Sequence, residues 1–222
     1  MKDRFLLNYR VSGIKNLIDE VSLSFYKKTI TVPIHTEEYN IKGIYGVNGS
    51  GKSAILESVN IMRNLMTDVN YLNNPIVQEN LNEIINKRTS KLSISADFLV
   101  KDSQNIYLFR YNINLIKNAV GRYIIDEEKL LYKKATSRKE ELDILIHIKD
   151  GEVVEIYKEE DTDLKKYFIK KTMNLLSNSS SLILYSEVMS NSDEFKTRRV
   201  SFLGMCLWAL RIVAENIYIY MD

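Results

Sequence analysis

The sequence has a single cysteine and two histidines among its 222 residues. One cysteine, Cys206, excludes an internal disulfide and suits a reducing compartment such as the cytoplasm. We expect its side chain to be buried, because a free cysteine behaves mostly as a small apolar residue. His35 and His147 are isolated from any cluster of Cys, Asp or Glu with ligand spacing, so the sequence predicts no metal site of that kind.

Strong net charge and long hydrophobic runs are also missing. Lysines and arginines number 31 against 29 acidic residues, a formal net charge of +2, which excludes a global basic field for nucleic acid. The first eight residues hold no apolar run long enough for a signal peptide. The apolar stretch 200–210 ends at Arg211, short of the roughly 18 residues that a membrane-spanning helix needs. We therefore expect a cytoplasmic protein without a membrane segment, in which 200–210 forms a buried or partner-facing helix.

The segment 46–53, Gly-Val-Asn-Gly-Ser-Gly-Lys-Ser, fits the phosphate-binding pattern G-x-x-x-x-G-K-[ST] at every fixed position. Its three glycines allow a tight turn that brings backbone N–H groups to phosphate oxygens. Lys52 supplies a positive charge for the β- and γ-phosphates, and the Ser53 hydroxyl can ligate Mg²⁺. The residues predicted to contact the nucleotide are Gly46, Asn48, Gly49, Ser50, Gly51, Lys52 and Ser53.

The flanks of this loop support the match. Residues 39–45 are predicted to form a short strand that leads into the loop, and 53–67 a helix whose apolar residues recur every three or four positions. A loop at a helix N-terminus meets free N–H groups and a favourable dipole, which suit an anion. The alternative is a glycine-rich turn with a chance lysine.

Residues 5–11 and 21–25 alternate between apolar and polar side chains, which predicts two antiparallel strands around a turn. Between them lies 13–17, Gly-Ile-Lys-Asn-Leu. Strand, turn segment, second strand and phosphate loop in this order resemble the start of the ABC-type ATPase heads of the SMC, RecF and OLD group. That group includes AAA-type ATP-binding proteins of bacterial defence modules. The resemblance is most specific over residues 5–62.

The resemblance implies an α/β protein with a P-loop NTPase core, a flanking antiparallel sheet and a C-terminal helical segment. It implies ATP and Mg²⁺ as cofactors, a dimer or oligomer around the nucleotide, and a DNA or effector-protein partner in DNA maintenance or phage defence. It also makes Lys15 and Asn16 additional nucleotide contacts. Without the resemblance, an exposed Lys-Asn pair in a turn would be solvated surface.

The chain divides into four predicted parts. Residues 1–67 form the N-terminal part of the P-loop core, and 68–90 a polar insertion with a short helix. Residues 91–160 carry period-two strands of an antiparallel side sheet, whose tyrosines and phenylalanines we interpret as core and cross-strand partners. Residues 161–222 are helical. The predicted strands are 92–100, 105–115, 121–132, 143–149 and 152–157, and the predicted helices are 161–177, 182–185 and 195–220, the last with Trp208 in its buried stripe.

Two segments could be mistaken for catalytic motifs. Residues 123–128 end in Asp-Glu-Glu like a Walker B strand, but only three apolar residues precede the acids and the segment sits among meander strands. By the resemblance, Glu128 belongs to a strand without a catalytic role. Gln78 is the residue available for the Mg²⁺-binding glutamine that ABC heads carry, but no strand is predicted before it, so we interpret it as a surface residue.

No signature like L-S-G-G-Q and no switch histidine can be placed, so the catalytic residues remain unknown. We expect the N-terminal half of a head, or a truncated relative that borrows the missing groups from a partner. Complete, such a head would hydrolyse ATP. The alternative is a non-hydrolysing, nucleotide-dependent assembly or nucleic-acid-associated module. A P-loop kinase or GTPase is a third possibility, although no N-K-x-D guanine reader or acceptor lid is evident.

Overall fold

The structure, a computed structural model, describes residues 3–26, 41–101, 104–137, 141–158, 160, 162–190 and 201–219. Strands and helices alternate in blocks along the chain. The strands are β1 Asp3–Ser12, β2 Val21–Ser24, β3 Lys91–Lys101, β4 Ile106–Lys117, β5 Tyr123–Lys134, β6 Asp143–Lys149 and β7 Glu152–Ile156. The helices are α1 Lys52–Thr67, the 3₁₀ turn η1 Tyr71–Asn73, α2 Pro75–Ile84, α3 Thr162–Thr172, α4 Ser181–Ser190 and α5 Phe202–Glu215.

All seven strands belong to one antiparallel sheet in the order β2-β1-β3-β4-β5-β6-β7. The hairpin and the five meander strands predicted from period-two alternation are confirmed. The N-terminal hairpin pairs with the meander through β1 and β3, from Asp3 opposite Lys101 to Ser12 opposite Ser93. The hairpin assigned to the P-loop part and the strands assigned to the side sheet are therefore one continuous sheet.

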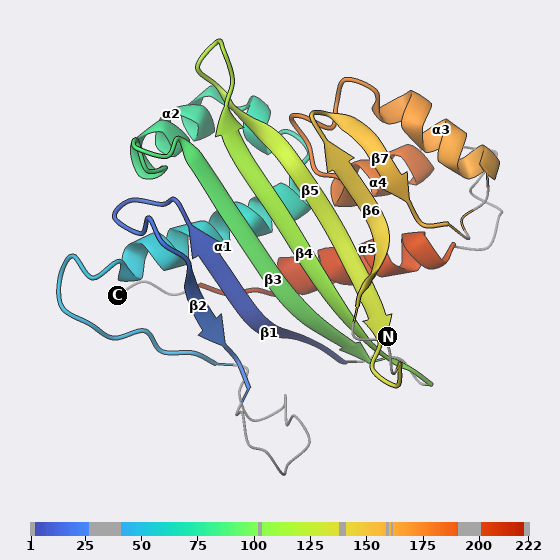
Figure 1. The fold of residues 1–222 in the computed structure, drawn as a ribbon, viewed down its shortest axis with the longest axis horizontal. Helices are drawn as coiled ribbons and strands as arrows, with labels where there is room; N and C mark the ends of the chain where they lie inside the picture. The colour runs from blue at the N-terminus through green and yellow to red at the C-terminus, as the bar shows by residue number, and fades with distance from the viewer. Residues whose placement is uncertain are drawn as a thin grey trace.

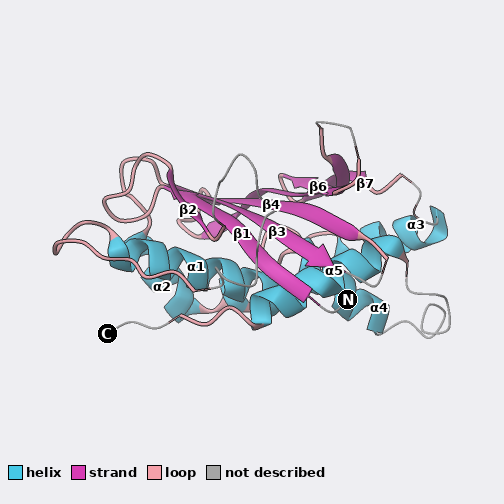
Figure 2. Cartoon of the chain, turned by 90° about the horizontal axis from the view of Figure 1, so that it is seen from below, coloured by secondary structure: helices cyan, strands magenta, loops and turns pink. Residues whose placement is uncertain are grey.

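Helices α1, α4 and α5 lie on one face of this sheet, so the molecule has two layers (Figures 1 and 2). Their contacts enclose the core, because β3 and β4 turn every second side chain towards them. These inward residues are Leu92, Ile94, Ala96, Phe98, Val100, Tyr107, Phe109, Tyr111, Ile113 and Leu115. Helix α1 contributes the stripe Ile55, Val59, Met62 and Met66 that its spacing predicted.

A charged cluster occupies the opposite face of the sheet. Asp97 accepts from the Arg10 guanidinium at 3.1 Å and from Arg110 Nε at 2.7 Å, across three neighbouring strands. The Asp97 side chain is largely buried, and two cations compensate its charge. The cluster therefore ties β1, β3 and β4 together on the side that the helices do not cover.

The C-terminal helix is shorter than predicted and turns a different face inward. Of the predicted 195–220, residues 195–200 and 220 lie outside the described residues, and α5 runs from Phe202 to Glu215. Trp208 is 52% exposed beneath the Arg4 guanidinium, 5.5 Å from its ring centroid, so its predicted burial is wrong. The buried stripe instead passes through Leu207 and Cys206, which lie about 100° and about 160° around the helix from Trp208. Burial raises the pKa of the Cys206 thiol well above its ordinary value.

The polar insertion is an ordered helix. Asn74 caps α2 by accepting from Ile76 N at 2.9 Å, and Pro75 starts the helix at its first position. Gln78, predicted at the surface, is buried instead. Its amide nitrogen donates to Leu72 O and Tyr123 O, and its amide oxygen accepts from Tyr123 N at 2.7 Å. Gln78 therefore fastens α2 to the start of β5 and is a structural residue.

The turn after β1 begins at Gly13, whose φ of +81° few other residues tolerate. Its N–H donates to Leu17 O at 2.7 Å, and a Cβ at this position would overlap the carbonyl oxygen of Lys91. Gly121, in the β4–β5 turn, has the similar φ of +83°, but a Cβ there would lie 3.8 Å from Lys117 Cε. The two glycines therefore have similar backbone conformations and differ in the room available for a Cβ atom.

We expect Gly13→Ala to lower the free energy of unfolding by at least about twice as much as Gly121→Ala. The left-handed conformation alone costs a Cβ-bearing residue about 1–2 kcal/mol, and only Gly13 adds an overlap with backbone. Urea unfolding of the two variants beside the parent protein measures the difference. Equal losses would contradict the close approach of Gly13 to β3.

Candidate phosphate-binding site

The loop 46–53 lies at the N-terminus of α1, the position its motif requires (Figure 1). Gly51 is the N-cap with φ 93° and ψ 5°, and its carbonyl accepts the helical bond from Ile55 N at 3.1 Å. No side chain caps the helix and no acidic residue occupies its first turn. The N–H groups of that turn therefore present the positive end of a 16-residue helix, which favours an anion.

Lys52 folds back onto the loop. Its Nζ donates to Gly46 O at 2.6 Å and to Val47 O at 2.9 Å, while Ser50 N donates to Val47 O at 3.2 Å. These bonds give the loop a closed turn of its own. An ammonium group has three donors, and charged phosphate oxygens are stronger acceptors than peptide carbonyls. Lys52 is therefore placed to exchange a carbonyl for a phosphate oxygen without leaving the loop.

The strand predicted before the loop is absent over its described part. Residues 41–45 have no regular structure, and 39–40 lie outside the described residues. Ile41 is 89% exposed and Tyr45 95%, whereas Ile44 packs against the core. Within the described parts of the chain no strand pairs with this segment, and extended backbone without a neighbour forms no ladder. Lys42 Nζ, which donates to Ser24 O at 3.2 Å, links the segment to β2.

The structure brings Lys15 and Asn16 to the loop and to α1. The Asn16 amide nitrogen donates to Gly49 O at 2.8 Å. Lys15 Nζ pairs with Glu57 Oε1 on α1 at 2.7 Å. Both contacts join residues more than 30 positions apart, so motif spacing alone could not reveal Glu57 as the partner of Lys15.

Glu128 and Glu127, the acids of the Walker B-like segment, are held within the sheet. Glu128 is fully buried, where Oε1 accepts from the Tyr111 hydroxyl at 2.8 Å and Oε2 from Ser181 N at 2.7 Å. Burial raises the pKa of Glu128 to about 7. Glu127 pairs with Lys129 at 2.8 Å and His147 at 3.0 Å, and the Lys129 hydrogen bond lowers its pKa. Three strands separate their strand, β5, from β2, the strand nearest the loop (Figure 1).

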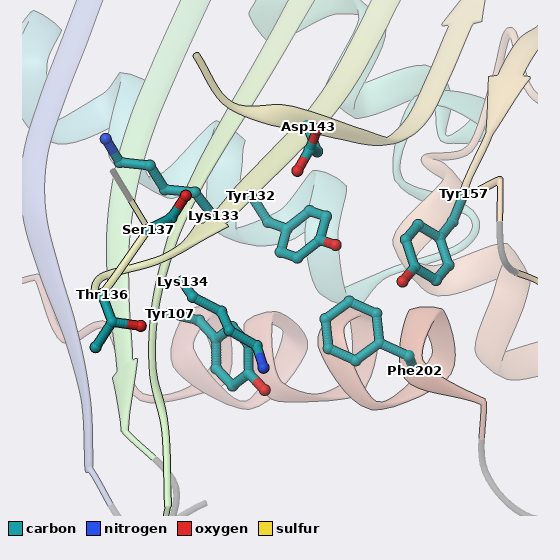
Figure 3. Close-up of a pocket in the computed structure, with 9 residues that line it drawn as sticks. All are labelled: Tyr107, Tyr132, Lys133, Lys134, Thr136, Ser137, Asp143, Tyr157 and Phe202. Atoms are coloured by element: carbon teal, nitrogen blue, oxygen red, sulfur yellow. The ribbon is translucent and has the colours of Figure 1, made fainter. Parts of the chain in front are cut away.

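A cavity of about 510 Å³ lies between the sheet and the start of α5, away from the loop. Figure 3 shows aromatic rings gathered around it. The Phe202 ring centroid lies 5.2 Å from that of Tyr132 and 5.3 Å from that of Tyr157. Tyr107 and Tyr157 are buried, as predicted for core and cross-strand partners. The lining residues are Tyr107, Tyr132, Lys133, Lys134, Thr136, Ser137, Asp143, Tyr157 and Phe202.

Comparison with models of known protein families and with curated proteins gave no match. The candidate site consequently depends on its own motif and geometry. Within the described ranges, none of the helices combines the length and the apolar character needed to cross a membrane.

The buried carboxyl of Glu128 predicts a pH dependence of stability. The unfolded chain loses this proton near pH 4.5, whereas the folded chain keeps it to about pH 7. Between these values the folded state binds more protons, so the free energy of unfolding falls as pH rises, by at most roughly 3 kcal/mol. We expect Glu128→Gln to remove this fall, because its amide can accept from Ser181 N and donate to the Tyr111 hydroxyl.

Glu127→Gln is the matched control for urea unfolding between pH 4.5 and 8. The lowered pKa of Glu127 contributes stability that is lost only as pH falls through its own, more acidic range. Glu127→Gln should therefore keep the parent's decline between pH 4.5 and 7. A Glu128→Gln variant with the same decline would show that another group titrates.

Proposed function

We propose that this chain binds ATP with Mg²⁺ through residues 46–53. The observation that carries the proposal is the uncapped N-terminus of α1, where the loop's backbone N–H groups and Lys52 meet without an acidic residue in the first turn. Ser53 lies on this first turn with an exposed side chain and would ligate Mg²⁺. The exposed loop leaves the site open to a ligand as large as a nucleotide.

Lys15 would supply a second positive charge, beside that of Lys52, to the proposed nucleotide site. Its pair with Glu57 is partly exposed, with side chains 38% and 29% accessible, so the pair contributes little, about 0–1 kcal/mol. A phosphate group carries more charge than one carboxylate and competes well for the same ammonium. Lys15 can therefore move from Glu57 to the phosphates when a nucleotide is bound.

We further propose that the chain is the N-terminal part of an ABC-type ATPase head that acts as a dimer or with its second half. The order of hairpin, turn, loop and helix beside an antiparallel sheet supports this interpretation. So does the exposed segment 41–45, which is where a further strand of a P-loop core would pair. A cytoplasmic location, a DNA or effector partner and a role in phage defence or DNA maintenance are proposals that depend on the resemblance alone.

A second candidate function is nucleotide binding without hydrolysis, as an assembly module. The placement of the acids favours it, because Glu128 holds α4 to the sheet and Glu127 is paired with Lys129 and His147. Hydrolysis needs a carboxylate that positions the attacking water beside the γ-phosphate. Neither glutamate lies on a strand next to the loop.

Replacing Lys52 by alanine should weaken ATP binding by about 10- to 100-fold, the usual effect of losing a charge-assisted bond to phosphate. Calorimetric titration of MgATP into the parent protein and the variant measures the loss. The fold should be unaffected, because the Lys52 ammonium donates to carbonyls of the loop and not to the core.

Lys42→Ala is the matched control, because Lys42 is an exposed lysine close to the loop whose Nζ donates to Ser24 O. It should bind ATP as the parent does. If Lys52→Ala retained the parent's affinity, the loop would not be the nucleotide site.

Steady-state ATP hydrolysis by the isolated chain should not exceed that of Lys52→Ala, although the parent binds the nucleotide. The reason is the structural engagement of Glu127 and Glu128. Phosphate release from both proteins at saturating MgATP tests this. Turnover above the variant would demonstrate a water-positioning carboxylate within the chain and would reject the non-hydrolysing alternative.

A further inference from the structure

The turn formed by residues 13–17 is closed by its own backbone. Gly13 N and Ile14 N both donate to Leu17 O, and Leu17 N donates back to Ile14 O at 2.8 Å. Lys15 adopts a left-handed conformation, with φ 48°, at the tip. A turn that contains a non-glycine residue in this region keeps its shape only when the surroundings hold it.

The end of α2 provides that support on one side. Lys15 N donates to Ile84 O at 2.6 Å, and the Asn86 amide nitrogen donates to Lys15 O at 2.6 Å. Asn86 N donates to Gly13 O at 2.9 Å, and the Ile14 side chain is fully buried. Both polar groups of the Lys15 backbone are thus bonded to the end of α2 and the segment that follows it.

On its other side the turn touches the phosphate loop at two points. The Asn16 amide nitrogen donates to Gly49 O at 2.8 Å. The Leu17 side chain packs on Gly51 so closely that a Cβ there would lie 2.7 Å from Leu17 Cδ2. Gly49, in contrast, has φ +82°, and a Cβ added to it would have no neighbouring atom within 4 Å. The loop tip at Gly49 is therefore held by its hydrogen bonds and not by packing.

We propose that Asn16 is a positioning residue that fixes the phosphate loop in its binding shape. This inference builds on the proposed function. By accepting from Asn16, the Gly49 carbonyl is held on the side of the turn, and the peptide it shares with Ser50 is fixed in orientation. The N–H of that peptide, Ser50 N, donates to Val47 O at 3.2 Å, so the turn is set from both sides before a ligand arrives. Binding avoids the entropic cost of ordering a glycine-rich loop, because that cost has been met during folding.

The placement of Asn16 distinguishes this role from direct phosphate binding. A side chain whose only role is to donate to phosphate would lower the affinity and leave the conformation of the loop unchanged when it is removed. The Asn16 amide nitrogen is bonded to the loop itself, through Gly49 O at 2.8 Å. Loss of the side chain should therefore loosen the ligand-free loop as well as weaken binding.

The test is Asn16→Ala, with Asn60→Ala as the matched control, since Asn60 is an exposed asparagine on α1. We expect Asn16→Ala to speed amide hydrogen exchange at Ser50 and Gly51 in the ligand-free protein, and to raise the dissociation constants for MgATP, MgADP and pyrophosphate by similar factors of about three to ten. The melting temperature should stay that of the parent. Asn60→Ala should change neither exchange nor affinity.

Unchanged exchange in ligand-free Asn16→Ala would overturn the positioning role whatever happens to affinity. Faster exchange with parental affinity would equally reject a role in binding. A general loss of melting temperature with faster exchange throughout the chain would reduce Asn16 to a structural residue. The proposed function fails separately, when the parent protein binds MgATP no better than Lys52→Ala.

Discussion

The structure depends on the burial of one face of a continuous sheet against α1, α4 and α5. Strand β3 joins the N-terminal hairpin to the meander, because it pairs with β1 on one side and β4 on the other, and its Ala96 and Phe98 lie in the core. Each fully buried large apolar side chain contributes about 1.5–3 kcal/mol. The packing of α1 in this layer places its N-terminus, and with it the phosphate loop, beside the hairpin edge. The geometry of the candidate site is thus a consequence of hydrophobic packing elsewhere in the molecule.

Local pattern was sufficient for the seven strands of the sheet and for α1, because period-two and three-to-four-residue repeats record which face an element buries. Pairing of β1 with β3 joins residues about 90 positions apart, and no local pattern encodes it. Trp208 and Gln78 were misplaced for a related reason. A large aromatic residue on an apolar helix, such as Trp208, suggests burial, and a polar residue in a polar segment, such as Gln78, suggests exposure. Both suggestions are wrong here, because the actual burial depends on neighbours that are distant in the sequence. The segment 41–45 has strand-like residues and no described strand beside it.

The place of the loop at a helix N-terminus could be predicted, because the whole motif lies within eight residues and the repeat of α1 follows directly. The burial of Glu128 could not, and a β-bulge explains why. Tyr123 and Ile125 point into the core, so strict alternation would turn Glu127 inward. The register shifts where Asn114 pairs with Glu127 and Leu115 with Ile125, which adds a residue to β5 and exchanges the faces. Because of this single inserted residue, Glu128 is buried beside Tyr111, and Glu127 lies on the other face, where it pairs with Lys129 and His147.

The 13–17 turn has a thermodynamic consequence for the helical insertion. Helix α2 is bonded to one side of this turn through Ile84 and Asn86, and the phosphate loop to the other through Asn16. If the loop binds a nucleotide as proposed, any molecule whose binding to α2 displaces the turn would change the affinity of the loop for that nucleotide. Linkage is reciprocal, so occupancy of the loop must change the affinity of that molecule by the same factor. Under the proposed function, a partner bound to the polar insertion would therefore be coupled to nucleotide binding at the loop.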